Sequence, residues 1–459
     1  MKDQQSIIVK EKRELEKWEK KKAKPRISGY IWALAVVVTL IHIVDETITN
    51  VNGSIQSNVV DEFFVRGMGL SYNEGLSQLS FLSIFSLIVS LAAPIYKTLA
   101  DRIGRKPLLV MNVLGFSLGM ALCFLSNNFM VYIAGMCCTT FFASHDMQVT
   151  YILESAPDDK RASFYGVTKG IGTIGCVMLP LLRMIFMGDD GTKWRLIFIV
   201  PCILGLVIAA FVVIFARETD PFLEKRIRFL KDDISRRESG EVAEGKKKAE
   251  NKVGIIEGAR YILKNRQLKF LLIVGILMSL PTMALSSYYQ SIMYLSGMSD
   301  SQITTALFAY PFVFAVFNIV TGRIADKVGR KPIVVAAGIG FCVFYVLFAA
   351  SCMMKWAPFL VGLMYALYIS CFWVVGDFRN MIVNESAPTR IRFSVTGAIG
   401  VISFGVILAG MIISSICVGI FENVAVFCGV FSIPCIIIGT LIFLLKVKET
   451  NGVDLNSIE

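Results

Sequence analysis

Long apolar runs separated by short polar stretches dominate this chain. Typical runs read "YIWALAVVVTLIHIV" and "VFCGVFSIPCIIIGTLIFLL". Each run is about 20 residues long, which lets a helix cross the ~30 Å hydrocarbon core of a bilayer. Membrane strands are excluded because they alternate apolar and polar residues, and these runs do not. We predict twelve transmembrane helices, over residues 30–50, 76–96, 107–126, 130–152, 164–187, 194–215, 269–293, 303–321, 332–353, 357–381, 394–418 and 424–446.

Composition and charge agree with a membrane protein. Of the 459 residues, 55% are hydrophobic and 18% are charged, with a mean hydropathy of +0.64; soluble domains carry about 25% charged residues. The net charge is +11, and residues 1–29 and the loop 216–268 hold ten and fourteen Lys or Arg. The six loops predicted on the opposite side hold three. This bias predicts that both termini and the central loop are cytoplasmic, with an even number of spans. It assigns the basic charge to topology and anionic lipids rather than to nucleic acid.

The remaining segments define the domain boundaries. The first 26 residues, "MKDQQSIIVKEKRELEKWEKKKAKPR", are charged and contain no cleavable signal peptide, and a solvated tail is favoured over a surface amphipathic helix. All eleven cysteines fall in predicted helices without a C-x-x-C pair, so we expect packing roles and no metal site or cofactor. The predicted segments are a cytoplasmic tail 1–29, a six-helix bundle 30–216, a cytoplasmic central loop 217–268, a second six-helix bundle 269–448 and a tail 449–459.

Several motifs occur twice, once in each half. "ADRIGRKPLLV" at 100–110 recurs as "ADKVGRKPIVV" at 325–335, with seven of eleven positions identical. "ESAPDDKRASFYG" from Glu154 recurs as "ESAPTRIRFSVTG" from Glu385, an offset of 231 (385 − 154). "RET" at 217–219 recurs as "KET" at 448–450 with the same offset. Because the order is kept, we predict two parallel repeats that start on the same side of the membrane and enclose a site near the midplane.

These motifs resemble those of the major facilitator superfamily. Its signature G-x-x-x-D-[RK]-x-G-[RK]-[RK] is complete in the second copy and has Lys97 in place of the leading glycine in the first. The element E-x-x-P-x-x-x-R resembles the sugar-porter and organic-ion branch. The resemblance implies an all-α membrane fold of two pseudo-symmetric six-helix bundles that works by alternating access. It also implies a cytoplasmic gate that holds while the cavity faces outward, formed by Asp101, Arg105, Glu154, Arg161, Asp326, Arg330, Glu385 and Arg392. A basic loop that only sets topology is the alternative.

Small and cyclic residues in the repeated basic loop predict its backbone geometry. Gly104 and Gly329 allow conformations that a side chain would obstruct. Pro107 and Pro332 suit the first turn of the helix that follows. The loop is therefore predicted to reverse the chain within a few residues.

Charged residues of the first predicted helix are candidates for proton coupling. A charge at a helix centre in the membrane costs roughly 2.5–3.5 kcal/mol, so such residues usually face a cavity. His42, Asp45 and Glu46 share one helix face, and a histidine beside two acids can hold a proton near neutral pH. A solvated helix end is the alternative for the two acids. By resemblance, proton-coupled carriers often bear an acid here, but the arginine that sugar symporters pair with it is replaced by Ala134.

Further polar residues in the predicted helices 4, 5, 7 and 10 are candidates for substrate binding. Asp146 and Lys169 lie at similar predicted depths and can pair, and Lys169 stands where sugar porters carry a glutamine, which suggests an anionic or zwitterionic ligand. Arg379 can bind a carboxylate or phosphate as a fork. Structural pairing, snorkelling and an interfacial aromatic belt are the alternatives. The candidate set is Lys169, Arg379, Asp146, Asp377, Tyr289, Gln290 and Trp373. Arg183 is assigned to an interfacial anchor, and Pro281 is expected to bend its helix.

The sequence therefore predicts a secondary active transporter. We expect it to move a small polar, anionic or zwitterionic, metabolite or sugar together with protons, as a monomer in the plasma membrane. No P-loop is present, so ATP-driven transport is not supported. Proton-coupled efflux of drugs or metabolites remains an alternative. A distant alternative is an intramembrane aspartyl protease using Asp146 and Asp377, although "SHDM" and "VVGD" both lack the G-x-G-D motif.

Overall fold

The computed structural model of this chain describes residues 2–23, 30–93, 96, 103–142, 151, 154–155, 171–172, 175–238, 255–388 and 391–450. The first half contains α1 (Lys2–Ala23), α2 (Tyr30–Ser54), α3 (Gln56–Val60), the π-helix η1 (Asp61–Arg66), α4 (Tyr72–Ser90), α7 (Arg105–Phe124), α8 (Phe129–Phe142), α11 (Gly175–Phe186), the 3₁₀-helix η2 (Trp194–Phe198) and α12 (Ile199–Phe215). The central region contains α13 (Asp220–Glu238) and α14 (Ile255–Lys264). The second half contains α15 (Arg266–Ser279), α16 (Thr282–Ser286), α17 (Tyr289–Leu295), α18 (Asp300–Leu307), α19 (Ala309–Val328), α20 (Arg330–Met353), α21 (Pro358–Ser386), α22 (Arg392–Ile420) and α23 (Val424–Lys446).

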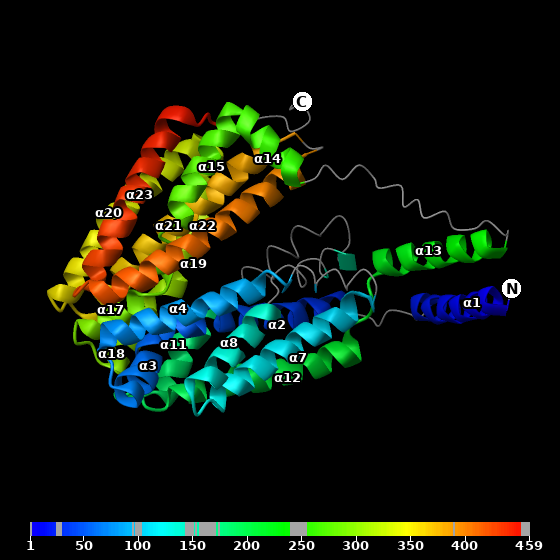
Figure 1. Cartoon of the computed structure of the whole chain (residues 1–459), viewed down its shortest axis with the longest axis horizontal. Coiled ribbons are helices and arrows are strands. Elements are labelled where there is room, and N and C mark those ends of the chain that lie inside the picture. The colour runs from blue at the N-terminus through cyan, green and yellow to red at the C-terminus, as the bar shows by residue number, and fades with distance from the viewer. Residues whose placement is uncertain are drawn as a thin grey trace.

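The long helices form two bundles that meet at one end and diverge toward the other (Figure 1). One bundle contains α2, α4, α7, α8, α11 and α12, and the other contains α15 to α23. We call the end with α3, α17 and α18, where the bundles meet, the distal end. The opposite end, with α1, α13 and α14, is the terminal end (Figure 1). Helix α4 packs along α22 and forms the longest seam between the bundles.

Many helices present apolar residues on their outer surface. Among the described residues, eight helices are long and apolar enough to cross a membrane, and two shorter apolar helices span Phe129–Phe142 and Gly175–Phe186. Large side chains such as Ile214 of α12 and Leu445 of α23 are about 70% exposed. An apolar surface of this kind is suited to lipid. The chain is therefore an all-α, multi-pass integral membrane protein.

The predicted bend at Pro281 is confirmed. Helix α15 ends at Ser279, and Pro281 is the N-cap residue of α16. Proline lacks an N–H group, so it interrupts the hydrogen-bond ladder between α15 and α16. A second break, at Ser287 and Tyr288, separates α16 from α17. The break places α17 at the distal end, where it contacts α3 and α2.

The prediction of a solvated tail at the N-terminus is wrong. Residues Lys2–Ala23 form α1, which packs antiparallel to α13. Trp18 stacks edge-on against Phe222 with ring centroids 5.6 Å apart, and Leu223 and Leu230 complete the small apolar cluster. Ion pairs flank the cluster and link Lys12 to Glu238, Lys22 to Glu224, Arg226 to Glu14, Lys231 to Glu19 and Arg237 to Glu11. The apolar stripe of α1 is only a few residues wide, and its partner lies some 200 residues away, so the local pattern suggested a charged tail.

Candidate functional site

A buried ion pair joins the two bundles at the distal end. Nη2 of Arg183 on α11 lies 2.8 Å from Oδ1 of Asp300 at the start of α18, and the two side chains are 0% and 6% exposed. Nε of Arg183 donates to Oγ1 of Thr304 at 3.1 Å, and Nη1 donates to the carbonyl oxygen of Ser54. Nδ2 of Asn58 donates to the other carboxylate oxygen of Asp300 at 3.0 Å. A buried charge left without its partner is strongly destabilising, so this pair ties the bundles together.

The prediction that Arg183 is an interfacial anchor is therefore wrong. Its guanidinium is fully buried and bonded to the opposite bundle. The anchor role was predicted because Arg183 lies near the end of a predicted helix. Asp300 lies 117 residues away in the sequence (300 − 183), and no motif or repeat connects the two residues.

A second group of polar contacts also joins the two bundles at the distal end. We call these contacts and the Arg183–Asp300 pair the distal seal. Oε1 of Gln290 on α17 accepts the backbone N–H of Ser57 at 2.6 Å, and Nε2 of Gln290 donates to the Ser57 hydroxyl. The Ser291 hydroxyl donates to Oε1 of Gln56 at 2.9 Å and accepts from the Tyr72 hydroxyl at 2.9 Å. Gln290 is fully buried. In this state the predicted substrate-binding glutamine is engaged between the bundles.

Tyr289 lies in an aromatic group just inside this seal. Its ring stacks on Tyr365 of α21 with centroids 4.4 Å apart, and Tyr310 of α19 lies 5.7 Å from Tyr365. A Cβ atom at Gly53 of α2 would sit 3.2 Å from the Tyr289 hydroxyl oxygen, so Tyr289 touches the opposite bundle. Aromatic rings in such a place can stack on a ligand or close a gate. The role predicted for Tyr289 remains a prediction, and the sequence interpretation missed Tyr310 and Tyr365.

The three proton-coupling candidates of α2 are withdrawn from water to different degrees. His42 and Asp45 are 7% and 2% exposed, whereas Glu46 is half-buried. Glu46 accepts a weak hydrogen bond from the Cys176 thiol of α11 at 3.8 Å, and the His42 ring lies against Gly172. The alternative of a solvated helix end is therefore wrong for Asp45. The proton role of this face remains a prediction.

Helix α21 carries a buried arginine and an exposed polar face. Arg379 is 7% exposed, and a Cβ atom at Gly275 of α15 would overlap its Nη1 atom. Its Nη2 donates to Oδ1 of Asn380 at 2.5 Å, while Nε and Nη1 have no hydrogen-bond partner among the described residues. Asp377 and Trp373 are exposed and lie on another face of α21, as the two-residue spacing of Asp377 and Arg379 predicts.

Several predicted positions cannot be placed. Asp101, Asp146, Arg161 and Lys169 lie outside the described residues, as do the side chains of Asp326 and Arg392. The proposed pairing of Asp146 with Lys169 therefore remains a prediction.

An ion-pair cluster fastens the terminal end of the first bundle. Nε of Arg105 lies 3.2 Å from Oε2 of Glu154, which also accepts from the Thr219 hydroxyl at 2.6 Å. Glu218 accepts the backbone N–H of Arg105 at 2.7 Å and so caps the start of α7. Burial raises the pKa of Glu218. Gly104 has φ of +108°, and a Cβ atom there would overlap the Glu218 carboxylate.

The second bundle repeats this cluster residue for residue. Nη2 of Arg330 lies 2.8 Å from Oε1 of Glu385, whose other oxygen accepts from the Thr450 hydroxyl at 2.5 Å. Glu449 accepts the backbone N–H groups of Arg330 at 3.1 Å and Lys331 at 2.8 Å. The preceding Gly329 has φ of +95°. The predicted need for glycine at positions 104 and 329 is confirmed at both sites.

The sequence predicted four members of the two clusters as gate residues: Arg105, Glu154, Arg330 and Glu385. Arg105 pairs with Glu154, and Arg330 pairs with Glu385, each within one bundle. The role of these residues in a cytoplasmic gate remains a prediction. The acids that cap the next helix, Glu218 and Glu449, were missed. The sequence did contain a pattern that marks both acids, because "RET" and "KET" recur at the same offset of 231 (449 − 218).

Comparisons with known proteins agree with this architecture. The sequence profile of the Major Facilitator Superfamily matches residues 63–406 and 273–456. The glucose transporter GlcP of Staphylococcus epidermidis is 24% identical over 382 residues, which cover 79% of this chain and 83% of GlcP. The class H tetracycline resistance protein of Pasteurella multocida is 25% identical over 139 residues, 30% of this chain and 34% of that protein.

Solved structures of xylose transporters share the fold. The inward open conformation of XylE from E. coli has a TM-score of 0.67 and 15% identity, covering 93% of this chain and 99% of XylE. A crystal structure of a D-xylose–proton symporter has a TM-score of 0.69 and 16% identity, covering 92% and 99%. The profile match, which spans well over half of the sequence, shows that this chain belongs to the Major Facilitator Superfamily.

Proposed function

We propose that this protein is a secondary active transporter that moves a sugar or another small polar metabolite by alternating access, coupled to protons. The observation that carries the proposal is the uneven distribution of bonds between the bundles. Arg183–Asp300 and Gln290–Ser57 join the bundles at the distal end, whereas the terminal clusters each stay within one bundle. A carrier caught open on one side has this arrangement.

The proposal includes a topology of twelve spans in two six-helix repeats, in the plasma membrane. The positive-inside distribution of Lys and Arg supports a cytoplasmic terminal end. The divergence of the bundles at that end would then make this an inward-facing state (Figure 1). The inward open conformation of XylE is among the solved structures that share the fold.

An anionic or zwitterionic substrate is supported by Arg379. Two of its buried nitrogen atoms have no partner among the described residues, and a buried donor left unpaired costs free energy that a bound acceptor recovers. Lys169, at a predicted depth similar to that of Asp146, would add a second cation. A neutral sugar could still use Arg379 as a hydrogen-bond donor to its hydroxyl groups.

Proton coupling is supported by the buried face of α2. Asp45 is almost wholly withdrawn from water, and Glu46 and His42 lie within one helical turn of it. Ionisable side chains within a membrane-spanning helix are rare and often belong to proton or ion pathways. The name D-xylose–proton symporter given to one structural neighbour points in the same direction.

Uptake into proteoliposomes tests the proposal. Purified protein is assayed with labelled neutral sugars, sugar acids and amino acids, with and without an inward proton gradient. We expect saturable accumulation of one class that collapses when the gradient is removed. Asp45→Asn should abolish accumulation but leave exchange of substrate intact, while Asp232→Asn on the exposed face of α13 should behave as wild type. Gradient-driven loss of lipophilic drugs instead of uptake would favour an efflux pump, and non-saturable flux would contradict a carrier.

A further inference from the structure

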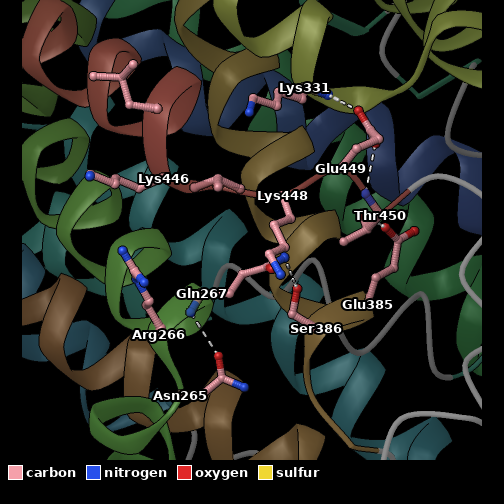
Figure 2. A pocket seen from close by; sticks show the side chains of 12 residues that line it. Asn265, Arg266, Gln267, Lys331, Glu385, Ser386, Lys446, Lys448, Glu449 and Thr450 are labelled. Atoms are coloured by element: carbon pink, nitrogen blue, oxygen red, sulfur yellow. Dashed lines mark hydrogen bonds between the residues drawn. The ribbon is translucent and has the colours of Figure 1, made fainter.

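A hollow lies at the terminal end of the second bundle. It has a volume of ≈ 900 Å³ and is lined by the start of α15, the start of α20, the end of α21 and the segment that follows α23. Figure 2 shows its side chains, which include those of Arg266, Lys331, Lys446 and Lys448. The space lies outside the seam between the bundles. It is therefore separate from the proposed substrate path.

The lining carries an excess of positive charge. Its four basic residues face only two acids, Glu385 and Glu449. Glu385 is paired with Arg330, and Glu449 accepts backbone N–H groups at the start of α20. Within the described part of the chain, none of the four basic side chains forms an ion pair or a hydrogen bond with an acid. Among the described residues of the lining, the cations therefore outnumber the acids by two.

The equivalent corner of the first bundle is closed by the chain itself. Lys106, the counterpart of Lys331, donates to the carbonyl oxygen of Val213 at 2.8 Å. Arg217, the counterpart of Lys448, donates to the carbonyl oxygen of Lys21 in α1 at 3.2 Å. Phe215 stands at the position of Lys446, by the repeat offset of 231 (446 − 215). In the first repeat the two cations thus donate to backbone oxygens, one of them on α1. The second repeat has a lysine, Lys446, in place of the phenylalanine.

The position and chemistry of the hollow fit a phosphate group. Lysine and arginine are the usual partners of phosphate in proteins. Lys446 ends the membrane-length helix α23, and the neighbouring Leu445 is 71% exposed. This places the cations at headgroup depth beside an apolar surface that can contact an acyl chain.

We propose that this hollow binds the phosphate of an anionic ligand, either a phospholipid headgroup or a soluble phosphate compound. The site is distinct from the transport site and belongs to the second repeat alone. Arg266 and Lys331 approach the phosphate from the helix starts, and Lys446 and Lys448 approach it from the end of α23.

Lipid binding is measured by native mass spectrometry of the detergent-solubilised full chain, titrated with phosphatidylglycerol or with phosphatidylcholine. Inorganic phosphate is titrated separately by calorimetry. The wild type should bind phosphatidylglycerol more tightly than phosphatidylcholine at one site. In Lys446→Gln/Lys448→Gln that preference should fall by about thirtyfold, because each basic residue near an anionic surface contributes about a fivefold factor. Arg266→Gln/Lys331→Gln should give a loss of similar size.

The matched control is Lys17→Gln/Lys225→Gln, which removes the same charge from exposed positions of α1 and α13. It should leave both titrations unchanged. Loss of phosphatidylglycerol preference in the two hollow variants alone identifies a lipid ligand. Loss of phosphate binding in those variants with unchanged lipid preference identifies a soluble phosphate ligand. Binding of both probes that is the same in wild type, hollow variants and control overturns the proposal.

Discussion

The two ends of the molecule use charge in opposite ways. At the distal end, Arg183 and Asp300 are buried and come from different bundles. At the terminal end, Arg105–Glu154 and Arg330–Glu385 are partly exposed, and each pair lies within a single bundle. A buried pair cannot be separated without a large free-energy cost, whereas a partly exposed pair within one rigid body can move as a unit. The distal contact therefore joins the two bundles in this structure, and the terminal contacts each stabilise one bundle.

Breaking the distal pair should have the largest effect. Arg183→Met leaves Asp300 buried without its cation. We expect this to destabilise the state in which the bundles meet at the distal end by about 3–5 kcal/mol. Asp300→Asn should act similarly. The readout is thermal unfolding of purified protein together with the accessibility of a label at Met68.

The double variant Arg183→Met/Asp300→Leu is the matched control. Replacing both charges with apolar groups of similar size removes the unpaired charge, so most of the lost stability should return. If each single variant is as stable as wild type, the pair does not hold the distal end.

Glycine substitutions test the repeated terminal clusters. Gly104→Ala and Gly329→Ala place a side chain where φ is +108° and +95°, which costs about 1–3 kcal/mol. Each added Cβ also overlaps the capping carboxylate, Glu218 or Glu449. Gly104→Ala should be the more damaging, because Glu218 is half-buried whereas Glu449 is exposed and can move aside. The apparent melting temperature is the measurement. Gly400→Ala, in open space on α22, should be neutral, and an effect there equal to the other two would remove the argument from backbone strain.

The burial of Glu218 is expected to make a smaller contribution to stability, and this contribution depends on pH. Because the pKa of Glu218 is raised on folding, its contribution to stability is complete at low pH and declines as pH rises through that pKa. The stability advantage of wild type over Glu218→Gln should therefore shrink as pH rises above about 4, the ordinary pKa of a glutamate. Melting curves across this range provide the test. A growing advantage for wild type would reverse the sign argued here.

The smallest effect on the bundles is expected from Trp18→Ala. Trp18 belongs to the apolar cluster between α1 and α13, which is separate from the main core. Hydrogen exchange should become faster in α1 and α13 while the bundle helices keep their protection. Faster exchange throughout α2 and α7 would mean that the helical pair supports the first bundle.

The sequence predicted features that repeat or that follow from local geometry. The basic loops, Gly104 and Gly329, the bend at Pro281 and most of the long helices were recognised because their signals lie within about 20 residues. The cap by Glu218 was recoverable from the "RET" and "KET" repeat. Arg183–Asp300 and the packing of α1 on α13 were not, because their partners lie more than 100 residues apart in the sequence and neither belongs to a repeated motif.

The central claim is that the two ends open in alternation, and distances within each end test it most directly. Spin labels are introduced as non-canonical amino acids, which avoids the eleven native cysteines. One pair, at Met68 and Met354, reports the distal end, and another, at Ser90 and Lys327, reports the terminal end. On adding a transported substrate or changing pH, we predict that the distal distance grows in the same fraction of molecules in which the terminal distance shortens. Two fixed distances, or two distances that grow together, would contradict alternating access.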